Sequence, residues 1–221
     1  MSFYQELQKQ TAEDRQRLLA SPIIARCQQG DISRAMYIHF LTQAYYHVSH
    51  TVPLLMCAGS RLAASYEAVR GAIAEYIDEE YGHQEWILND IRTCGGDAEK
   101  VRNGTPGLPI EMMIAYLYYR IERINPMSLF GMVLVLEGTS VSIASAVAAQ
   151  VEHTLALPEQ ATTYLRSHGE LDQGHLRFFA SLMDTITDKD DQTAIIHTAR
   201  RVYHLYGQML EQLGNDANEP A

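Results

Sequence analysis

Hydrophobic residues recur every three or four positions along most of the 221-residue chain, the spacing of amphipathic α-helices. No segment calls for a β-sheet. We therefore expect one all-α domain over residues 1–221, a seven- to eight-helix bundle with a frayed tail at 213–221. The helices are predicted at about 2–19, 22–30, 33–59, 65–93, 110–124, 127–149, 158–187 and 189–213.

Local signals support several of these limits. Ser21-Pro22 combines a capping residue with proline at the first helical position, and Ser33 can cap the third helix. Pro53 is expected to kink that third helix. Gly95-Gly96 ends the fourth helix, and the Gly, Pro, Asn and Asp content of 94–109 predicts a loop.

The segment 127–149 is almost continuously apolar and is long enough to cross a bilayer. However, Glu137 lies in its middle, several Ser and Thr residues follow, and neither flank is rich in Lys or Arg. A helix buried at the centre of a soluble bundle fits this composition better.

The formal net charge is −10 and no basic cluster is present, which argues against nucleic acid or an anionic membrane as a partner. Cys27, Cys57 and Cys94 are widely spaced and odd in number. The N-terminal residues are polar rather than a secretory signal. We expect a cytoplasmic protein with reduced thiols.

The stretch His-Gly-Glu-Leu-Asp-Gln-Gly-His, from His168 to His175, lies inside a predicted helix. At about 100° per residue, Asp172 lies about 40° to one side of His168 around the helix axis and His175 about 20° to the other side. Two imidazoles and a carboxylate on one stripe are donors that divalent transition metals take together. The spacing predicts a metal-binding face, and an exposed polar face is the alternative.

A second candidate element is the E-x-x-H spacing of Glu80 and His83, predicted to lie well inside the helix over 65–93. Carboxylate-bridged di-iron bundles use this spacing. Glu79, four residues before His83, lies on the same face and competes with Glu80 as the ligand. Paired glutamates are also common on solvated helix faces, so the motif alone does not establish a site.

The third candidate is Glu137, which interrupts the most apolar helix of the chain. A buried carboxylate costs several kcal/mol unless it is paired, hydrogen-bonded or bound to a metal. Thr139 and Ser140 could satisfy a protonated Glu137, and Arg120 or Arg123 could pair with it. These alternatives remain open at the level of the sequence.

Taken together, these elements supply three imidazoles and three carboxylates from three helices. Two ferrous ions would bring such a set close to charge balance, whereas one zinc ion would use only three or four of its members. Ferritin-like bundles carry a second E-x-x-H, which this chain lacks. The candidate metal ligands are Glu80, His83, Glu137, His168, Asp172 and His175.

This order of motifs resembles the haem-oxygenase-like di-iron oxidases, relatives of thiaminase II and of the pyrroloquinoline-quinone synthase fold. The resemblance extends from about residue 33 to 210 and implies that the six candidates are iron ligands. Some members have the first carboxylate where this chain has Tyr76. True haem oxygenases use a proximal His near the N-terminus, and no His precedes His39 here, so haem is disfavoured.

The resemblance implies an O₂-dependent oxidoreductase with two Fe²⁺ ions, although manganese would use the same ligand types. Its small-molecule substrate would be an amine, an amino acid or a fatty acid, and a homodimer is expected. The alternatives are a metal-independent, thiaminase-II-like hydrolase and a non-catalytic helical binding protein. Candidate pocket residues outside the ligand set are Tyr76, Tyr81, His47 and His50.

Overall fold

The computed structural model describes residues 1–216, except for the side chains of 168–175 and 215–216. Within that part, every regular element is helical, so the predicted all-α class is confirmed. Short 3₁₀ turns and one π-helical turn, Arg120–Ile124, connect some of the helices. The α-helices are α1 (Phe3–Leu19), α2 (Pro22–Gln28), α3 (Arg34–Val48), α4 (Thr51–Arg61), α5 (Glu67–Glu80), α6 (His83–Thr93), α7 (Ala98–Arg102), α8 (Leu108–Tyr119), α9 (Leu129–Leu155), α10 (Thr163–Asp184) and α11 (Lys189–Asp216).

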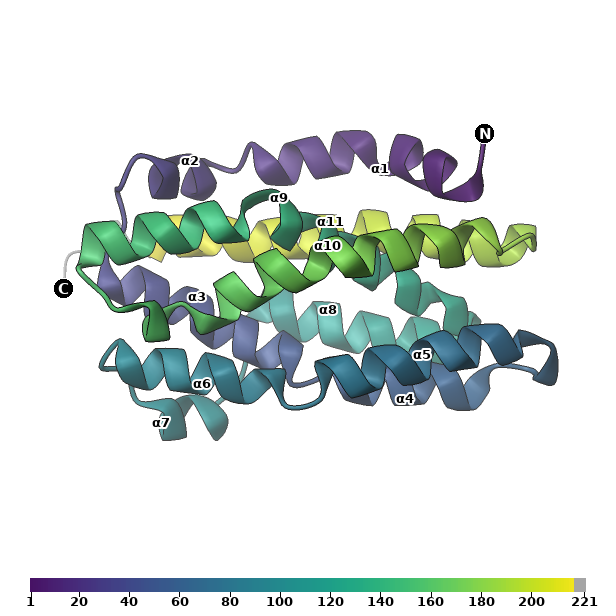
Figure 1. Ribbon diagram of the computed structural model, residues 1–221, viewed down its shortest axis with the longest axis horizontal. Helices are drawn as coiled ribbons and strands as arrows, with labels where there is room; N and C mark the ends of the chain where they lie inside the picture. Colours follow the sequence, from purple (N-terminus) through teal and green to yellow (C-terminus); the bar gives the residue numbers. More distant parts are fainter. Residues whose placement is uncertain (217–221) are drawn as a thin grey trace.

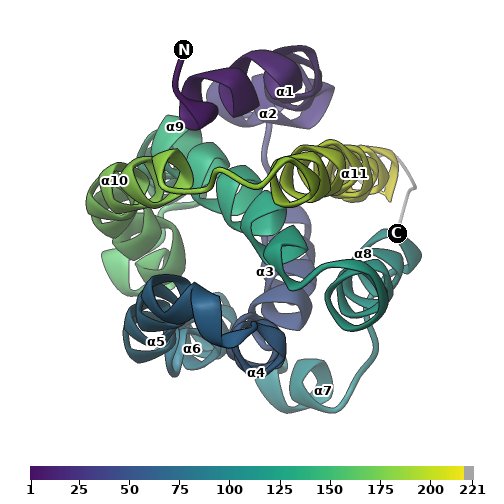
Figure 2. The ribbon, with the colours of Figure 1, turned by 90° about the vertical axis from the view of Figure 1, so that its right-hand side faces the viewer.

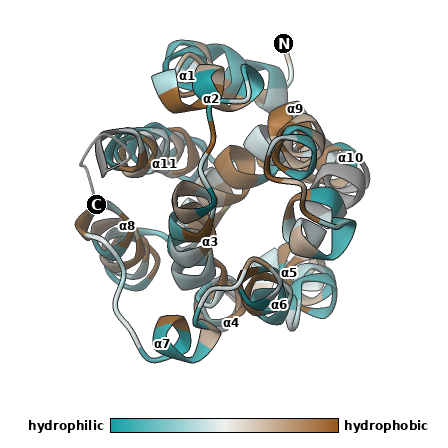
Figure 3. Cartoon of the chain, turned by 90° about the vertical axis from the view of Figure 1, so that its left-hand side faces the viewer, coloured by the Kyte–Doolittle hydropathy of each residue, from teal (hydrophilic) through white to brown (hydrophobic). Residues whose placement is uncertain are grey.

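The apolar helix α9 crosses the middle of the bundle (Figures 1 and 2) and packs against α10, α11 and α2. Phe130 and Val135 on α9 are fully buried. Figure 3 shows hydrophobic residues concentrated toward the centre and hydrophilic ones on the outer helices. The span Pro126–Leu155 is long and apolar enough to cross a membrane, but its packing is that of the central core helix expected from the sequence.

Several helix ends follow from local sequence. The Ser2 hydroxyl accepts a hydrogen bond from the backbone N–H of Gln5, and the Gln5 side chain accepts one from the N–H of Ser2, which completes a capping box. Ser33 caps α3 through the N–H of Met36. At the end of α6, Gly95 adopts a positive φ of 81°, a conformation that glycine reaches without steric cost.

Two of the predicted long helices are divided, which corrects the sequence-based limits. The segment predicted at 33–59 breaks at Ser49 and His50, just before Pro53 in the first turn of α4. Proline lacks an N–H and clashes with the carbonyl four residues earlier, so the chain breaks there instead of kinking. The segment predicted at 65–93 breaks at Tyr81 and Gly82, where Gly82 has φ +91°. The E-x-x-H motif therefore spans a helix break.

Candidate metal centre

A small cavity of about 50 Å³ lies among α3, α4, α5, α9 and the start of α10. It brings Glu80 and Glu137, which are far apart in the sequence, to one space. We call it the carboxylate cavity. Its described lining is His47, Val48, Thr51, Leu55, Tyr76, Glu80, Met132, Val133, Leu136, Glu137, Ser140 and Tyr164.

Glu80 and His83 lie side by side across the break between α5 and α6. The His83 Nδ1 is 3.1 Å from the Glu80 Oε2, and both side chains are almost fully buried. Trp86, one turn further along α6, stacks on the His83 ring with centroids 3.9 Å apart. When Glu80 is ionised, it can accept a hydrogen bond from Nδ1–H, and in that tautomer Nε2 is the unprotonated nitrogen that could bind a metal.

The competing carboxylate differs from Glu80 in its surroundings. Glu80 is the last residue of α5 and lines the carboxylate cavity. Glu79 is exposed and is not among the residues that line it. The local geometry thus favours Glu80 over Glu79 as the residue that could reach a metal in this cavity.

Glu137 lies on α9 with only 8% of its surface exposed. The neighbouring hydroxyls do not donate to it: Thr139 donates to the carbonyl of Val135, and Ser140 to that of Leu136. Of the two arginines considered as partners, Arg123 is exposed on the π-helical turn after α8. Glu137 is a buried carboxylate on the wall of the cavity that Glu80 also lines, and a bound cation is one of the partners that stabilise such a group.

The helix that carries His168, Asp172 and His175 passes beside this cavity. These three side chains lie outside the described residues, so their assignment as ligands stays a prediction. The helix itself is continuous over Thr163–Asp184 and packs against α9 and α6. Tyr164, four residues before the motif, lines the carboxylate cavity, and Phe178, three residues after it, contacts Tyr76 of the cavity wall at 5.6 Å between ring centroids.

The start of α10 is attached to α6 by a buried carboxylate. Asp90 accepts hydrogen bonds from the backbone N–H groups of Thr163, at 3.2 Å, and Tyr164, at 2.9 Å. Asp90 is fully buried, and desolvation raises its pKa to about 6 despite these hydrogen bonds. It therefore acts as a helix cap supplied from another helix, and it positions Tyr164 at the cavity.

The other sequence-based candidates separate into two groups. His47 and Tyr76 are buried in the wall of the carboxylate cavity. His50 is hydrogen-bonded to the hydroxyl of Tyr118 at 3.1 Å, and burial lowers its pKa. Neither His50 nor Tyr81, which is 77% exposed, belongs to the described lining.

Two of the lining residues that the sequence did not identify as pocket candidates, Ser140 and Tyr164, line the carboxylate cavity and also a larger apolar cavity behind it. Tyr164 is one helical turn before His168, so the helical spacing that grouped the metal-ligand candidates could have identified it. Ser140 was considered only as a partner of Glu137, because hydroxyls that bond to their own helix are common in apolar helices.

In the part of the chain that the structure describes, no three His, Cys, Asp or Glu side chains are close enough to hold a metal ion. Among the described residues, the candidate metal ligands are the adjacent pair Glu80 and His83, together with Glu137 on the wall of the cavity that Glu80 lines. A complete ligand set in this cavity would therefore need donors from the 168–175 segment of α10.

Comparisons with known structures identify the fold. A domain of unknown function with a heme oxygenase-like fold from Shewanella denitrificans OS217 matches with a TM-score of 0.84 and 22% identity, over 98% of this chain and 93% of that one. A TenA homolog from Pseudomonas syringae pv. tomato DC3000 gives 0.80 and 10%, over 96% and 92%. Heme oxygenase from Leptospira interrogans gives 0.77 and 16%, over 96% and 100%.

At these identities the structural matches establish the fold alone. A comparison with curated protein sequences found no match. The sequence profile of a family described as iron-containing redox enzymes matches residues 38–207, which include α5, α6, α9 and α10. The match covers well over half of the chain, and the protein therefore belongs to this family of iron-containing redox enzymes.

Proposed function

We propose that this protein is a non-haem di-iron oxidase or oxygenase that uses O₂ to oxidise a small organic substrate. Family membership supports the iron and the redox class. The observation that carries the finer proposal is the meeting of two carboxylates with little exposed surface, Glu80 and Glu137, at one cavity beside α10. Acidic groups with little solvent exposure are costly unless they are paired, hydrogen-bonded or bound to a cation, and a metal centre would compensate for both at once.

In this proposal, three carboxylates and three neutral imidazoles hold the two irons. Bound ferrous ions would supply the electrons that reduce dioxygen. Manganese takes the same donor types and is the competing metal. The residues proposed to hold the metal are Glu80, His83, Glu137, His168, Asp172 and His175.

The surrounding residues give this cavity the properties that such chemistry needs. Glu80 can hold the tautomer of His83 through Nδ1, and the Trp86 ring limits the rotation of the imidazole. Tyr76, Met132 and Val133 are buried in the wall and exclude bulk water. A dry cavity strengthens the interactions of a bound cation with its carboxylates and limits unproductive reactions.

The test is iron loading under anaerobic conditions, followed by metal analysis and rapid mixing with O₂. We expect about two irons per chain and an absorbance transient on exposure to O₂. The Glu80→Gln variant should lose at least one iron and the absorbance transient. The Glu79→Gln variant changes an exposed residue one position away and should keep about two irons and the transient. Equal retention by the two variants would contradict the role of Glu80. Iron binding without an oxygen-dependent transient would instead support a non-catalytic binding protein.

A metal-independent hydrolase is the second candidate, because a TenA homolog shares the fold and Cys27 lines the apolar cavity. Burial raises the pKa of the Cys27 thiol, which disfavours the nucleophilic thiolate. Burial also raises the pKa of the Cys94 thiol to about 11, which likewise disfavours a nucleophilic thiolate there. A Cys27→Ser variant that keeps iron-dependent O₂ consumption would support the oxidase, and loss of a metal-independent hydrolysis in that variant would support the hydrolase.

A further inference from the structure

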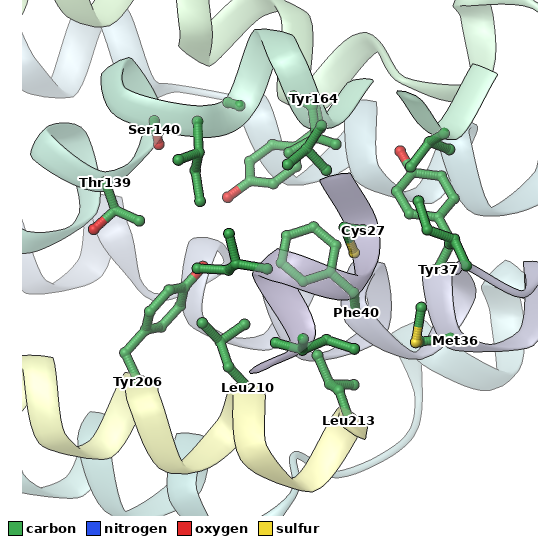
Figure 4. A pocket seen from close by; sticks show the side chains of 18 residues that line it. Cys27, Met36, Tyr37, Phe40, Thr139, Ser140, Tyr164, Tyr206, Leu210 and Leu213 are labelled. Atoms are coloured by element: carbon green, nitrogen blue, oxygen red, sulfur yellow. The ribbon is translucent and has the colours of Figure 1, made fainter. Parts of the chain in front are cut away.

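A second, larger cavity of about 90 Å³ lies among α2, α3, α9, α10 and α11. Figure 4 shows its walls, which are formed mostly by aliphatic and aromatic side chains. Among the described residues, none with a charged side chain lines it. We call it the apolar cavity, and a space of this composition favours an uncharged occupant.

The polar groups in its lining are neutral, and several already have hydrogen-bond partners. The Tyr37 hydroxyl donates to the carbonyl of Ala161 at 2.9 Å. The hydroxyls of Thr139 and Ser140 donate to carbonyls of α9. Burial raises the pKa of Tyr206 to about 12, so this phenol stays uncharged at neutral pH. An ionic group placed inside would lose its hydration without gaining a counter-ion from the described lining.

The apolar cavity adjoins the carboxylate cavity at one end. Ser140 and Tyr164 line both spaces. Tyr206 of the apolar cavity packs edge-on against the ring of His47, in the wall of the carboxylate cavity, with centroids 5.7 Å apart. In Figure 4, the hydroxyls of Ser140, Tyr164 and Tyr206 lie toward one end. Met36 and Tyr37 lie at the other end, where the Tyr37 hydroxyl is already bonded to the carbonyl of Ala161. A molecule in the apolar cavity would thus have its polar end toward Glu80 and Glu137.

The volume limits the size of that molecule. A cavity of about 150 Å³ holds one benzene molecule, so a cavity of about 90 Å³ holds only a short hydrocarbon segment. We infer that the apolar cavity binds the hydrocarbon body of the substrate, a short uncharged segment with a single polar end. The inference rests on the proposed function only in naming the bound molecule a substrate. It favours a fatty molecule over an amino acid.

The test is a binding series on iron-free protein with straight-chain primary alcohols, from butan-1-ol to dodecan-1-ol, measured by calorimetry. Affinity should rise about fourfold per methylene while the chain fits the cavity and stop rising once the cavity is filled. Hexane-1,6-diol has as many non-hydrogen atoms as heptan-1-ol but would bury a second hydroxyl, so it should bind roughly tenfold more weakly. Affinity that is independent of chain length, or equal binding of the diol, would overturn the inference.

Two variants locate the binding within the protein. Ala144 is buried in the cavity wall, so Ala144→Leu should shorten the preferred alcohol by about two carbons. Phe40 also lines the cavity, and Phe40→Ala should lengthen the preferred alcohol. Ala149 is exposed on α9, the helix that carries Ala144, so the control variant Ala149→Leu should leave the preferred chain length unchanged.

The two cavity variants change the volume in opposite directions. An unchanged preference in both variants would overturn the inference, and so would an unchanged preference in the one that folds if the other does not. The measurement needs no iron and no turnover. The alcohol series can therefore succeed while the iron and O₂ test fails, or the reverse, and the two outcomes remain distinguishable.

Discussion

Replacing Asp90 with asparagine tests how α10 is attached to the rest of the bundle. The Asp90 carboxyl is fully buried and caps the first turn of α10 through the N–H groups of Thr163 and Tyr164. Desolvation raises its pKa from 3.8 to about 6. Its electrostatic neighbours, Tyr37 and Cys94, have pKa values raised further above neutrality by burial, so neither changes charge between pH 4 and pH 7.

The direction of the pH effect follows from the two protonation equilibria. The folded protein holds the Asp90 proton more tightly than the unfolded chain does, because the folded pKa is the higher one. The contribution of Asp90 to the free energy of unfolding is therefore largest below pH 4 and is lost as the pH rises through 6. Between pH 5 and pH 7 the loss is about 1.3 kcal/mol when the unfolded pKa is taken as about 3.8 and the folded pKa as about 6.

Urea unfolding at pH 5, 6 and 7 measures this contribution. Asparagine keeps one carbonyl acceptor for the α10 cap and has no titrating charge. The Asp90→Asn variant should therefore lack the Asp90 contribution expected in the wild type, a decrease of about 1.3 kcal/mol in the free energy of unfolding from pH 5 to pH 7. The control is Asp97→Asn, which removes a carboxylate that caps α7 at an exposed position. The reasoning is refuted if Asp90→Asn and the wild type share one pH dependence, or if Asp97→Asn loses the same decrease.

Further predictions concern packing and a buried hydrogen bond. A Cβ at Gly131 would lie 2.6 Å from backbone atoms of α11, so Gly131→Ala should lower the free energy of unfolding by about 1–3 kcal/mol. Gly138 lies on the same helix, and a new Cβ there would have nothing within 4 Å, so Gly138→Ala should raise the free energy of unfolding by about 0.5–1 kcal/mol. Urea unfolding measures both variants, and effects of equal sign would contradict this difference. The Tyr66 hydroxyl donates to the buried Asp191 at 2.7 Å, so Tyr66→Phe should cost about 1.5–3 kcal/mol, and a cost near zero would show that this bond is replaced by water.

Local sequence was sufficient for most of the secondary structure. The three-to-four-residue hydrophobic period, the start at Pro22, the cap at Ser33 and the stop at Gly95 each act within a few residues, so they could be interpreted without knowing the fold. The burial of α9 at the centre was also predictable, because an apolar helix with an interior carboxylate and few flanking charges is typical of a bundle core. The all-α class and its resemblance to haem-oxygenase-like proteins followed from these features and the motif order.

The tertiary structure decided what local patterns leave open. A helical period continues smoothly through 65–93, and only the positive φ of Gly82 and the packing of α5 and α6 show that the chain turns there. Glu79 and Glu80 are nearly equivalent by spacing, yet one is exposed and the other lines a cavity with Glu137. The apolar cavity exists only because side chains from α2, α3, α9, α10 and α11 leave space between them. Periodicity is set by neighbours along the chain, whereas cavities depend on how distant segments pack, so only the folded arrangement could show them.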